Sequence, residues 1–512
     1  MNRASTLWAL SALAACGPKI DPGPVPVQVA AEPVRLVTQP VPDAPDLYLA
    51  AIVAAGSSWD PVGAEGTAQL AATALVEAGA GDRTAEEVRQ ALFPTGNAFE
   101  VVVEREWASI RLRCHRDDAA LCTELFVDAL TRPRLDEVDV IRLRDQQLQR
   151  LTDGMLADEE HLAWELFEAS LYEGHPYGHP PEGRAGVLPL VDTAAVRDFY
   201  AAHYVRPAMV VGAAGAVDDA VVQALTEGLA AVPARMLQDH PLMAPESLPG
   251  RVLVAADTAT PVTGFTFGHA LDLGRGDPDW PAMWVAVTAL GAHRQSFGRL
   301  FGALRGDRGL NYGDYAYLEP HVEQRRAPDA DQGTLRRTDR FMVWIRPTSL
   351  ENGPFALKLA LDEVGRWRDE GLTPEAFEDV RGYLRRHLPV LAPDPGRRLL
   401  FALDAAATGT PDLLSMGPAL DALTVEQVNA AIPRHIQLDD LRIVAVSGEA
   451  QQLVEALTGD APTPIVYAEG ADVSAEQAER DAAVAASDVH LARTRAGDAP
   501  AAWVIDAEAA FR

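Results

Sequence analysis

Apolar positions follow two different periods along the chain, and they predict both helices and strands in each half. Four apolar residues of each half share one helix face: Leu121, Leu125, Phe126 and Ala129, and Phe377, Val380, Leu384 and Leu388. Strict alternation over residues 340–346 indicates a strand instead. Two helix starts are marked by capping residues, Thr373 before Pro374 and Thr424 with Gln427 three residues later.

The order of these elements repeats. A helix, a strand and a second helix are predicted over 193–225, and the same order returns over 424–457. Thr193 and Thr424 lie almost as far apart as Gly215 and Gly448. We therefore predict an α+β protein with two homologous mixed-sheet and helix domains. The first covers 46–235 and the second 251–463, and they are joined by a Pro-containing linker, 236–250.

The N-terminus reads as an export segment. Residues 1–16 hold one Arg and a short apolar run that ends at Cys16, too short for a membrane-spanning helix. Small residues before this Cys resemble the bacterial lipobox, which implies lipidation of Cys16; an ordinary signal peptide cut near Ala15 is the alternative. Because Gly17 is not Asp, the resemblance implies a lipid anchor in the outer membrane, facing the periplasm. A Pro-rich tether, 17–45, follows.

The net charge argues against nucleic-acid binding, and two cysteines are candidates for a disulfide. The formal net charge of the 512 residues is -30, so the chain would repel nucleic acid. Cys114 and Cys122 fall at the end of a predicted strand and in the first turns of the next helix. Their spacing allows a disulfide, and two buried thiols fit equally well. Residues 464–512 form an acidic tail whose attachment to the body the sequence leaves open.

Three stretches of the first half, 55–79, 175–178 and 186–212, resemble the insulinase/pitrilysin family of zinc peptidases (inverzincins) in order and spacing. The likeness extends over 46–460. It implies two domains of the insulinase-like (LuxS/metallohydrolase-like) type. Active members carry H-x-x-E-H on the first helix and a further Glu downstream, which bind zinc and activate water.

This chain lacks that motif. Its matching positions are Gln69, Ala72 and Thr73, and the helix expected over 142–153 offers only Asp145 and Asp153 as carboxylates. We therefore expect this chain to bind no zinc. Two other His-containing pairs are read as structural: His175 and His179 in a loop, and His161 with Glu165 as an exposed i,i+4 pair.

The second half retains a different signature of the family. Over 297–317 the sequence resembles the family's helix, Arg, glycine turn, Tyr and strand, which puts Arg305 and Tyr312 at the positions of its substrate-facing Arg/Tyr pair. Guanidinium and phenol donors suit a peptide carbonyl or an oxyanion. The alternative is local: Arg305 pairs with Asp307, and Tyr312 starts a half-buried strand.

The resemblance implies a non-catalytic, substrate-binding subunit of an envelope-anchored zinc metallopeptidase. A partner subunit with H-x-x-E-H would carry the zinc, and the pair would degrade or process peptides. The alternative is an inert peptide-binding or scaffold lipoprotein of the cell envelope. Activity at a different metal site is a third possibility.

Overall fold

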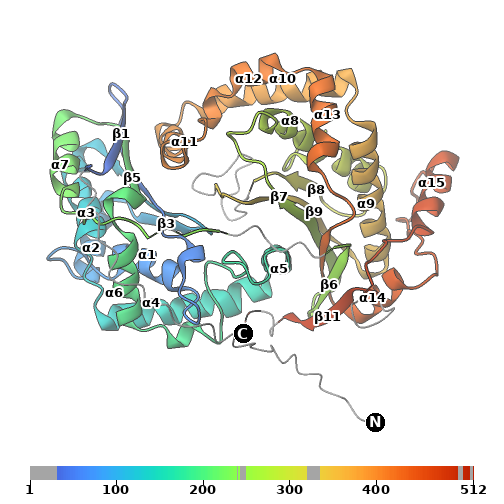
Figure 1. Ribbon diagram of the computed structural model, residues 1–512, viewed down its shortest axis with the longest axis horizontal. Coiled ribbons are helices and arrows are strands. Elements are labelled where there is room, and N and C mark those ends of the chain that lie inside the picture. Colours follow the sequence, from blue (N-terminus) through green and yellow to red (C-terminus); the bar gives the residue numbers. More distant parts are fainter. Residues whose placement is uncertain are drawn as a thin grey trace, which may run out of the picture.

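The computed structural model describes residues 32–238, 240–242, 249–319, 335–493, 500–507 and 511. Cys16 and the rest of the export segment lie outside these residues. Figure 1 shows two halves side by side, each built around one sheet. No helix in the described part of the chain is both long and apolar enough to cross a membrane.

The first half contains a five-stranded sheet in the order β1-β5-β2-β4-β3. Its strands are β1 (Arg35–Pro40), β2 (Asp46–Val53), β3 (Phe99–Val103), β4 (Ala108–His115) and β5 (Met209–Gly215). β1 pairs parallel to β5, and the remaining pairs are antiparallel. Since β1 lies within the segment expected to be a tether, the sheet begins before residue 46.

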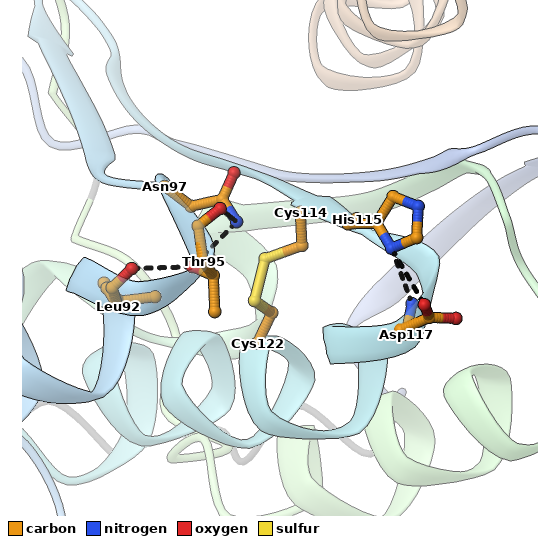
Figure 2. The surroundings of a disulfide bond; sticks show 7 residues. All are labelled: Leu92, Thr95, Asn97, Cys114, His115, Asp117 and Cys122. Atoms are coloured by element: carbon orange, nitrogen blue, oxygen red, sulfur yellow. Dashed lines mark hydrogen bonds and ion pairs between the residues drawn. A yellow bond between two sulfur atoms is a disulfide. The ribbon is translucent and has the colours of Figure 1, made fainter.

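All first-half helices except α5 (Glu159–Leu171) cover this sheet with their apolar faces and form one core with it. The covering helices are α1 (Thr67–Glu77), α2 (Ala85–Leu92), α3 (Ala119–Thr131), α4 (Glu137–Gln149), α6 (Thr193–His203) and α7 (Asp219–Leu229). A disulfide joins Cys114 on β4 to Cys122 on α3 (Figure 2). The pairing that the sequence left open is thus present, and it ties the sheet to its covering helix.

The second half repeats this topology with one strand added. Its sheet has the order β11-β6-β10-β7-β9-β8. The strands are β6 (Val252–Asp257), β7 (Val262–Leu271), β8 (Asp314–Tyr317), β9 (Asp339–Ser349), β10 (Arg442–Ser447) and β11 (Ala502–Asp506). β6 pairs parallel to β10 as β1 does to β5, and the other pairs of the repeat are again antiparallel. The predicted α+β class with two mixed sheets is confirmed.

The described second half contains eight α-helices: α8 (Trp280–Gly291), α9 (Gly353–Glu370), α10 (Pro374–Leu391), α11 (Pro395–Thr408), α12 (Gly417–Ala422), α13 (Val425–His435), α14 (Ala450–Thr458) and α15 (Ala475–Ala485). Both predicted caps are confirmed, since Thr373 accepts from the Ala376 amide and Thr424 forms a capping box with Gln427. The acidic tail supplies α15 and β11.

The two halves exchange helices. α5 packs its apolar residues, Leu162 and Phe167 among them, against the second sheet. α11 in turn packs Leu399 and Leu403 against the first sheet. Gly212 on β5 allows this approach, because a Cβ there would lie 2.6 Å from Leu399 Cδ1. Each sheet is therefore completed by a helix from the other half.

Candidate functional site

The three positions that matched the zinc motif lie on α1 and have structural partners. The Gln69 amide donates to Thr73 Oγ1 at 3.0 Å, so the i,i+4 pair bonds within itself. Ala72 is fully buried in the first core. Because an amide, a methyl group and a hydroxyl replace two imidazoles and a carboxylate, these residues do not fit a zinc ion.

The helix opposite α1 also has a structural role. Gln147 on α4 is fully buried, and its amide donates to the carbonyls of Gly66 at 3.0 Å and Glu182 at 2.9 Å. Asp145 is instead exposed and pairs with Arg144 at 2.9 Å. The sequence analysis missed Gln147. The signal was present, because Gln147 continues the spacing of the buried Val140 and Leu143.

A buried carboxylate holds the start of α1. Asp60 accepts the backbone N–H groups of Gly66 and Ala68, both at 2.7 Å, and lies 3.1 Å from His179 Nε2. Burial raises the pKa of Asp60, and the His179 contact acts in the opposite direction. His179 thus has a loop role. Among the described residues, no group of three or more His, Cys, Asp or Glu is placed to hold a metal ion.

The expectation of an exposed pair at His161 and Glu165 is wrong. Glu165 is mostly buried, and its carboxylate lies 2.6 Å from the guanidinium of Arg105, which is itself buried. Arg105 comes from the loop between β3 and β4, so sequence spacing could not reveal it. This ion pair joins α5 to the first sheet.

Arg305 and Tyr312 lie together in the second half. Arg305 ends a π-helical turn, Phe301–Gly306, and its Nη1 donates to the Tyr312 carbonyl at 3.1 Å. Its Cζ also lies 4.8 Å from the ring centroid of Phe301. The Tyr312 side chain is 76% exposed. Both side chains therefore present hydrogen-bond donors at the surface.

Among the residues that the structure describes, there is neither an ion pair between Arg305 and Asp307 nor a strand that starts at Tyr312. The Asp307 carboxylate lies 3.8 Å from Arg308, so Arg308 rather than Arg305 is its ion-pair partner. β8 begins at Asp314, two residues after Tyr312. The exposed Tyr312 side chain thus belongs to the loop before that strand.

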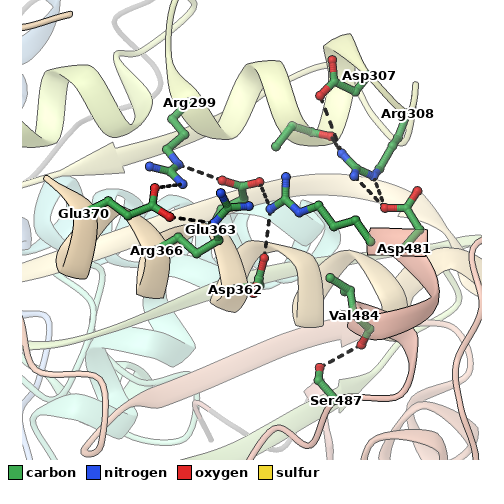
Figure 3. A network of polar contacts seen from close by, with 12 residues as sticks. Arg299, Asp307, Arg308, Asp362, Glu363, Arg366, Glu370, Asp481, Val484 and Ser487 are labelled. Carbon is green, nitrogen blue, oxygen red and sulfur yellow. Dashed lines mark hydrogen bonds and ion pairs between the residues drawn. The ribbon is translucent and has the colours of Figure 1, made fainter. Parts of the chain in front are cut away.

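The acidic tail supports the turn that carries Arg305 (Figure 3). Arg308 is buried, and its guanidinium lies 2.6 Å from Asp481 on α15. Arg308 also donates to the Ala303 carbonyl at 2.7 Å, inside the π-helical turn. On the same helix, Arg480 pairs with Asp362 of α9 at 2.9 Å. The tail is therefore connected through Arg308 to the turn that carries Arg305.

A second set of contacts connects the Tyr312 loop to the first half. Asn311 donates to Asp314 Oδ1 at 2.6 Å and to the Arg346 carbonyl at 3.0 Å. The Arg346 guanidinium lies 2.8 Å from Glu160, at the start of α5. Asp314 is fully buried, and this burial raises its pKa well above the usual range. The loop position thus depends on both halves.

A cavity of about 450 Å³ lies where the halves meet. Glu106 from the first half lines it and accepts from Arg337 of the second at 3.0 Å. Asp339 also lines it, and burial raises the pKa of Asp339 to about 7 although Arg340 and Arg336 act in the opposite direction. Ion pairs between the two halves therefore form part of the cavity wall.

Glu168 of α5 lies deeper in the same junction. Its carboxylate is 2.9 Å from Arg336 Nη1 and 2.5 Å from Arg340 Nε. Burial raises its pKa, but these guanidinium groups and Arg105 outweigh burial and bring the pKa to about 2. Glu168 is therefore ionised and binds β9 of the second half to α5 of the first.

The repeated fold and the altered zinc positions define a class of protein. Residues 191–384 match the family described as the Peptidase M16 inactive domain. The chain is therefore similar to insulinase-like proteins of the M16 peptidase family, and the matched region is a domain described as inactive.

Curated relatives and solved structures match a larger part of the chain. The chain is 28% identical over 422 residues to an uncharacterized zinc protease of Mycobacterium bovis, covering 79% of this chain and 88% of that protein. A protein of the same description from Mycobacterium tuberculosis matches equally. Among solved structures, a peptidase M16 inactive domain from Pseudomonas fluorescens has a TM-score of 0.71 at 23% identity, covering 82% of this chain and 98% of its own. A protease from Helicobacter pylori has a TM-score of 0.67 at 13% identity, with the same coverage. These two structures support the fold.

Proposed function

We propose that this protein is the non-catalytic, substrate-binding subunit of an envelope-anchored zinc metallopeptidase. A partner subunit with an H-x-x-E-H helix would hold the zinc, and this chain would supply Arg305 and Tyr312 to the bound peptide. The proposal rests on one observation. The zinc positions hold residues that cannot bind zinc, whereas Arg305 and Tyr312 remain together with their donors at the surface.

We assign to Arg305 and Tyr312 the role of hydrogen-bond donors to a carbonyl oxygen of the bound peptide. The N–H groups of a guanidinium and one phenol O–H can stabilise a peptide carbonyl as it gains negative charge. The hydrogen bond from Arg305 to the Tyr312 carbonyl fixes the loop relative to the guanidinium. The relatives described as zinc proteases favour peptides as the substrate class. Lipidation at Cys16 would hold the pair at the outer membrane.

The first experiment is a pull-down of the tagged, full-length protein from its own envelope in mild detergent, followed by mass spectrometry. We expect a near-stoichiometric partner with H-x-x-E-H and zinc-dependent peptide cleavage in the eluate. Recovery of the protein alone, without cleavage, would contradict the proposal and favour the scaffold function.

The Arg/Tyr role is tested in the assembled complex with Arg305→Gln and Tyr312→Phe. Because each variant removes a donor, we expect kcat for peptide cleavage to fall by about 100-fold, with the amount of complex unchanged. Arg116→Gln is the matched control, since Arg116 is an exposed arginine of the first half. Full activity in both variants would show that the pair does not reach the substrate.

A further inference from the structure

Exposed and partly exposed aromatic residues continue from Tyr312 across the surface of the second half. Arg305 contacts both the Tyr312 carbonyl and the Phe301 ring. Phe297, four residues before Phe301, is 45% exposed, and its ring lies 5.1 Å from Tyr383 on α10 in an edge-on arrangement. These residues connect the candidate site to a neighbouring helix.

The exposed face of α10 extends this surface. The rings of Tyr383 and His387 are stacked, 5.5 Å apart with an interplanar angle of 11°. Val390, about one turn further along, is 66% exposed. We call the surface formed by Phe297, Phe301, Tyr312, Tyr383, His387 and Val390 the aromatic stripe. Phe301, Tyr383 and His387 are partly exposed, and the other three side chains are exposed. A surface run of rings of this kind is typical of a binding surface.

The arginines beside the stripe lack acidic partners. Arg294, Arg305 and Arg386 are exposed, and none has a carboxylate partner among the described residues. Arg294 lies three residues before Phe297 in the chain, and Arg305 lies over the Phe301 ring. Arg386 lies along α10, where its Nη2 would be 3.2 Å from a Cβ at Gly382.

The acidic residues near these arginines either form ion pairs with other arginines or lie at the N-terminal end of α10. Arg381 binds Glu378 at 2.5 Å, and Arg385 binds Asp421 at 2.7 Å. Glu375 and Asp379 lie in the first two turns of α10, where the helix dipole favours negative charge. The last turns next to the stripe are therefore basic, although the whole chain has a net charge of -30.

We infer that the aromatic stripe binds an extended acidic peptide segment, with carboxylates facing Arg294 and Arg386 and apolar side chains against Phe297 and Tyr383. This inference rests on the proposed function, because it names the peptides that would reach Arg305 and Tyr312. A second copy of the chain suits the stripe less well, because two molecules of large negative charge repel each other.

The test measures binding to the purified full-length chain without a partner. The probe is a short fluorescein-labelled peptide of alternating Glu and Leu, followed by fluorescence anisotropy. Its controls are the same peptide with Lys or Gln in place of Glu. We expect the Glu peptide to bind most tightly and to be weakened when NaCl is raised from about 0.05 M to about 0.5 M.

Two variants test the stripe itself. The double variant Arg294→Gln/Arg386→Gln should raise Kd by about tenfold, and Phe297→Ser should raise it as well. Arg116→Gln should leave Kd unchanged. Thermal unfolding of each variant checks that the protein is folded, which we expect because all the replaced side chains are exposed.

Equal binding of the Glu and Lys peptides, or unchanged Kd in both stripe variants, would overturn the inference. So would concentration-dependent self-association that the double variant abolishes, since it would assign the stripe to a second copy. Failure here is distinguishable from failure of the proposed function. The pull-down and the Arg305 and Tyr312 variants depend on the partner, whereas peptide binding is measured in its absence.

Discussion

Asp339 is a buried carboxyl group at the start of β9, in the junction between the halves. Its pKa is raised to about 7 by burial, so the folded protein keeps a proton there that the unfolded chain releases near pH 4. The folded state then binds more protons than the unfolded state between those two values. The contribution of Asp339 to stability is therefore greatest at acidic pH and is lost as pH rises to about 7.

Asp339→Asn should remove this pH dependence. The Asn amide oxygen can still accept from the Arg340 N–H, which is 2.9 Å from Asp339 Oδ1. We expect the variant to match the wild type near pH 4 and to exceed it by about 1 to 3 kcal/mol at pH 8, measured by urea unfolding. Asp145→Asn is the control, because Asp145 is exposed. It should change the free energy of unfolding by the same amount at both pH values. A difference that stayed constant between the two pH values would contradict the argument.

Single residues also show which features of the candidate site could be predicted from the sequence. The loss of zinc ligands at Gln69 and Thr73 could be read directly, because it depends only on which side chains occupy one helix face. The partner of Glu165 could not be read, since Arg105 is distant in sequence. Gln147 was missed because a search for carboxylates passes over a buried amide that bonds to backbone.

At the scale of elements, α15 decides how the Arg305 turn is held. The buried Arg308 in that turn has its carboxylate partner, Asp481, on this helix (Figure 3). Tyr467 also donates to Asp481, and Gln477 of α15 donates to the Asp307 carbonyl at 3.1 Å. The tail is thus part of the second domain's structure rather than an appendage.

Asp481→Asn should loosen this element. Removing the carboxylate leaves the Arg308 charge buried without its partner, so we expect a loss of about 3 to 5 kcal/mol in the free energy of unfolding. Hydrogen exchange should also accelerate over residues 301–310. Glu86→Gln, which breaks the exposed pair with Arg89, should leave the free energy of unfolding almost unchanged, because water screens this pair. Equal losses in the two variants would mean that α15 does not hold the turn.

At the scale of the whole molecule, the exchanged helices couple the halves. α5 belongs to the first half in sequence and covers the second sheet, and α11 does the reverse. If one half unfolded, the sheet of the other half would lose the helix that covers one of its faces. Chains of this length often unfold domain by domain. Here we expect a single cooperative transition.

Leu403→Ala tests this coupling. Leu403 is fully buried between α11 and the first sheet, so its truncation should cost about 2 to 5 kcal/mol. Differential scanning calorimetry should show one transition that moves as a whole to lower temperature. Val62→Ala is the control, because Val62 is fully exposed and should leave the transition in place. Two resolved transitions, of which only one shifts, would show that the halves unfold independently.

The sequence by itself determined the repeated α+β halves and the capped helix starts. Each of these follows from spacing or side-chain chemistry within a short stretch of chain. Only the tertiary structure decided that residues 35–40 and 502–506 extend the sheets, that α5 and α11 are exchanged, and that Phe297 meets Tyr383. Those contacts join segments far apart in sequence, and no local periodicity records which of the many possible partners gives the lowest free energy.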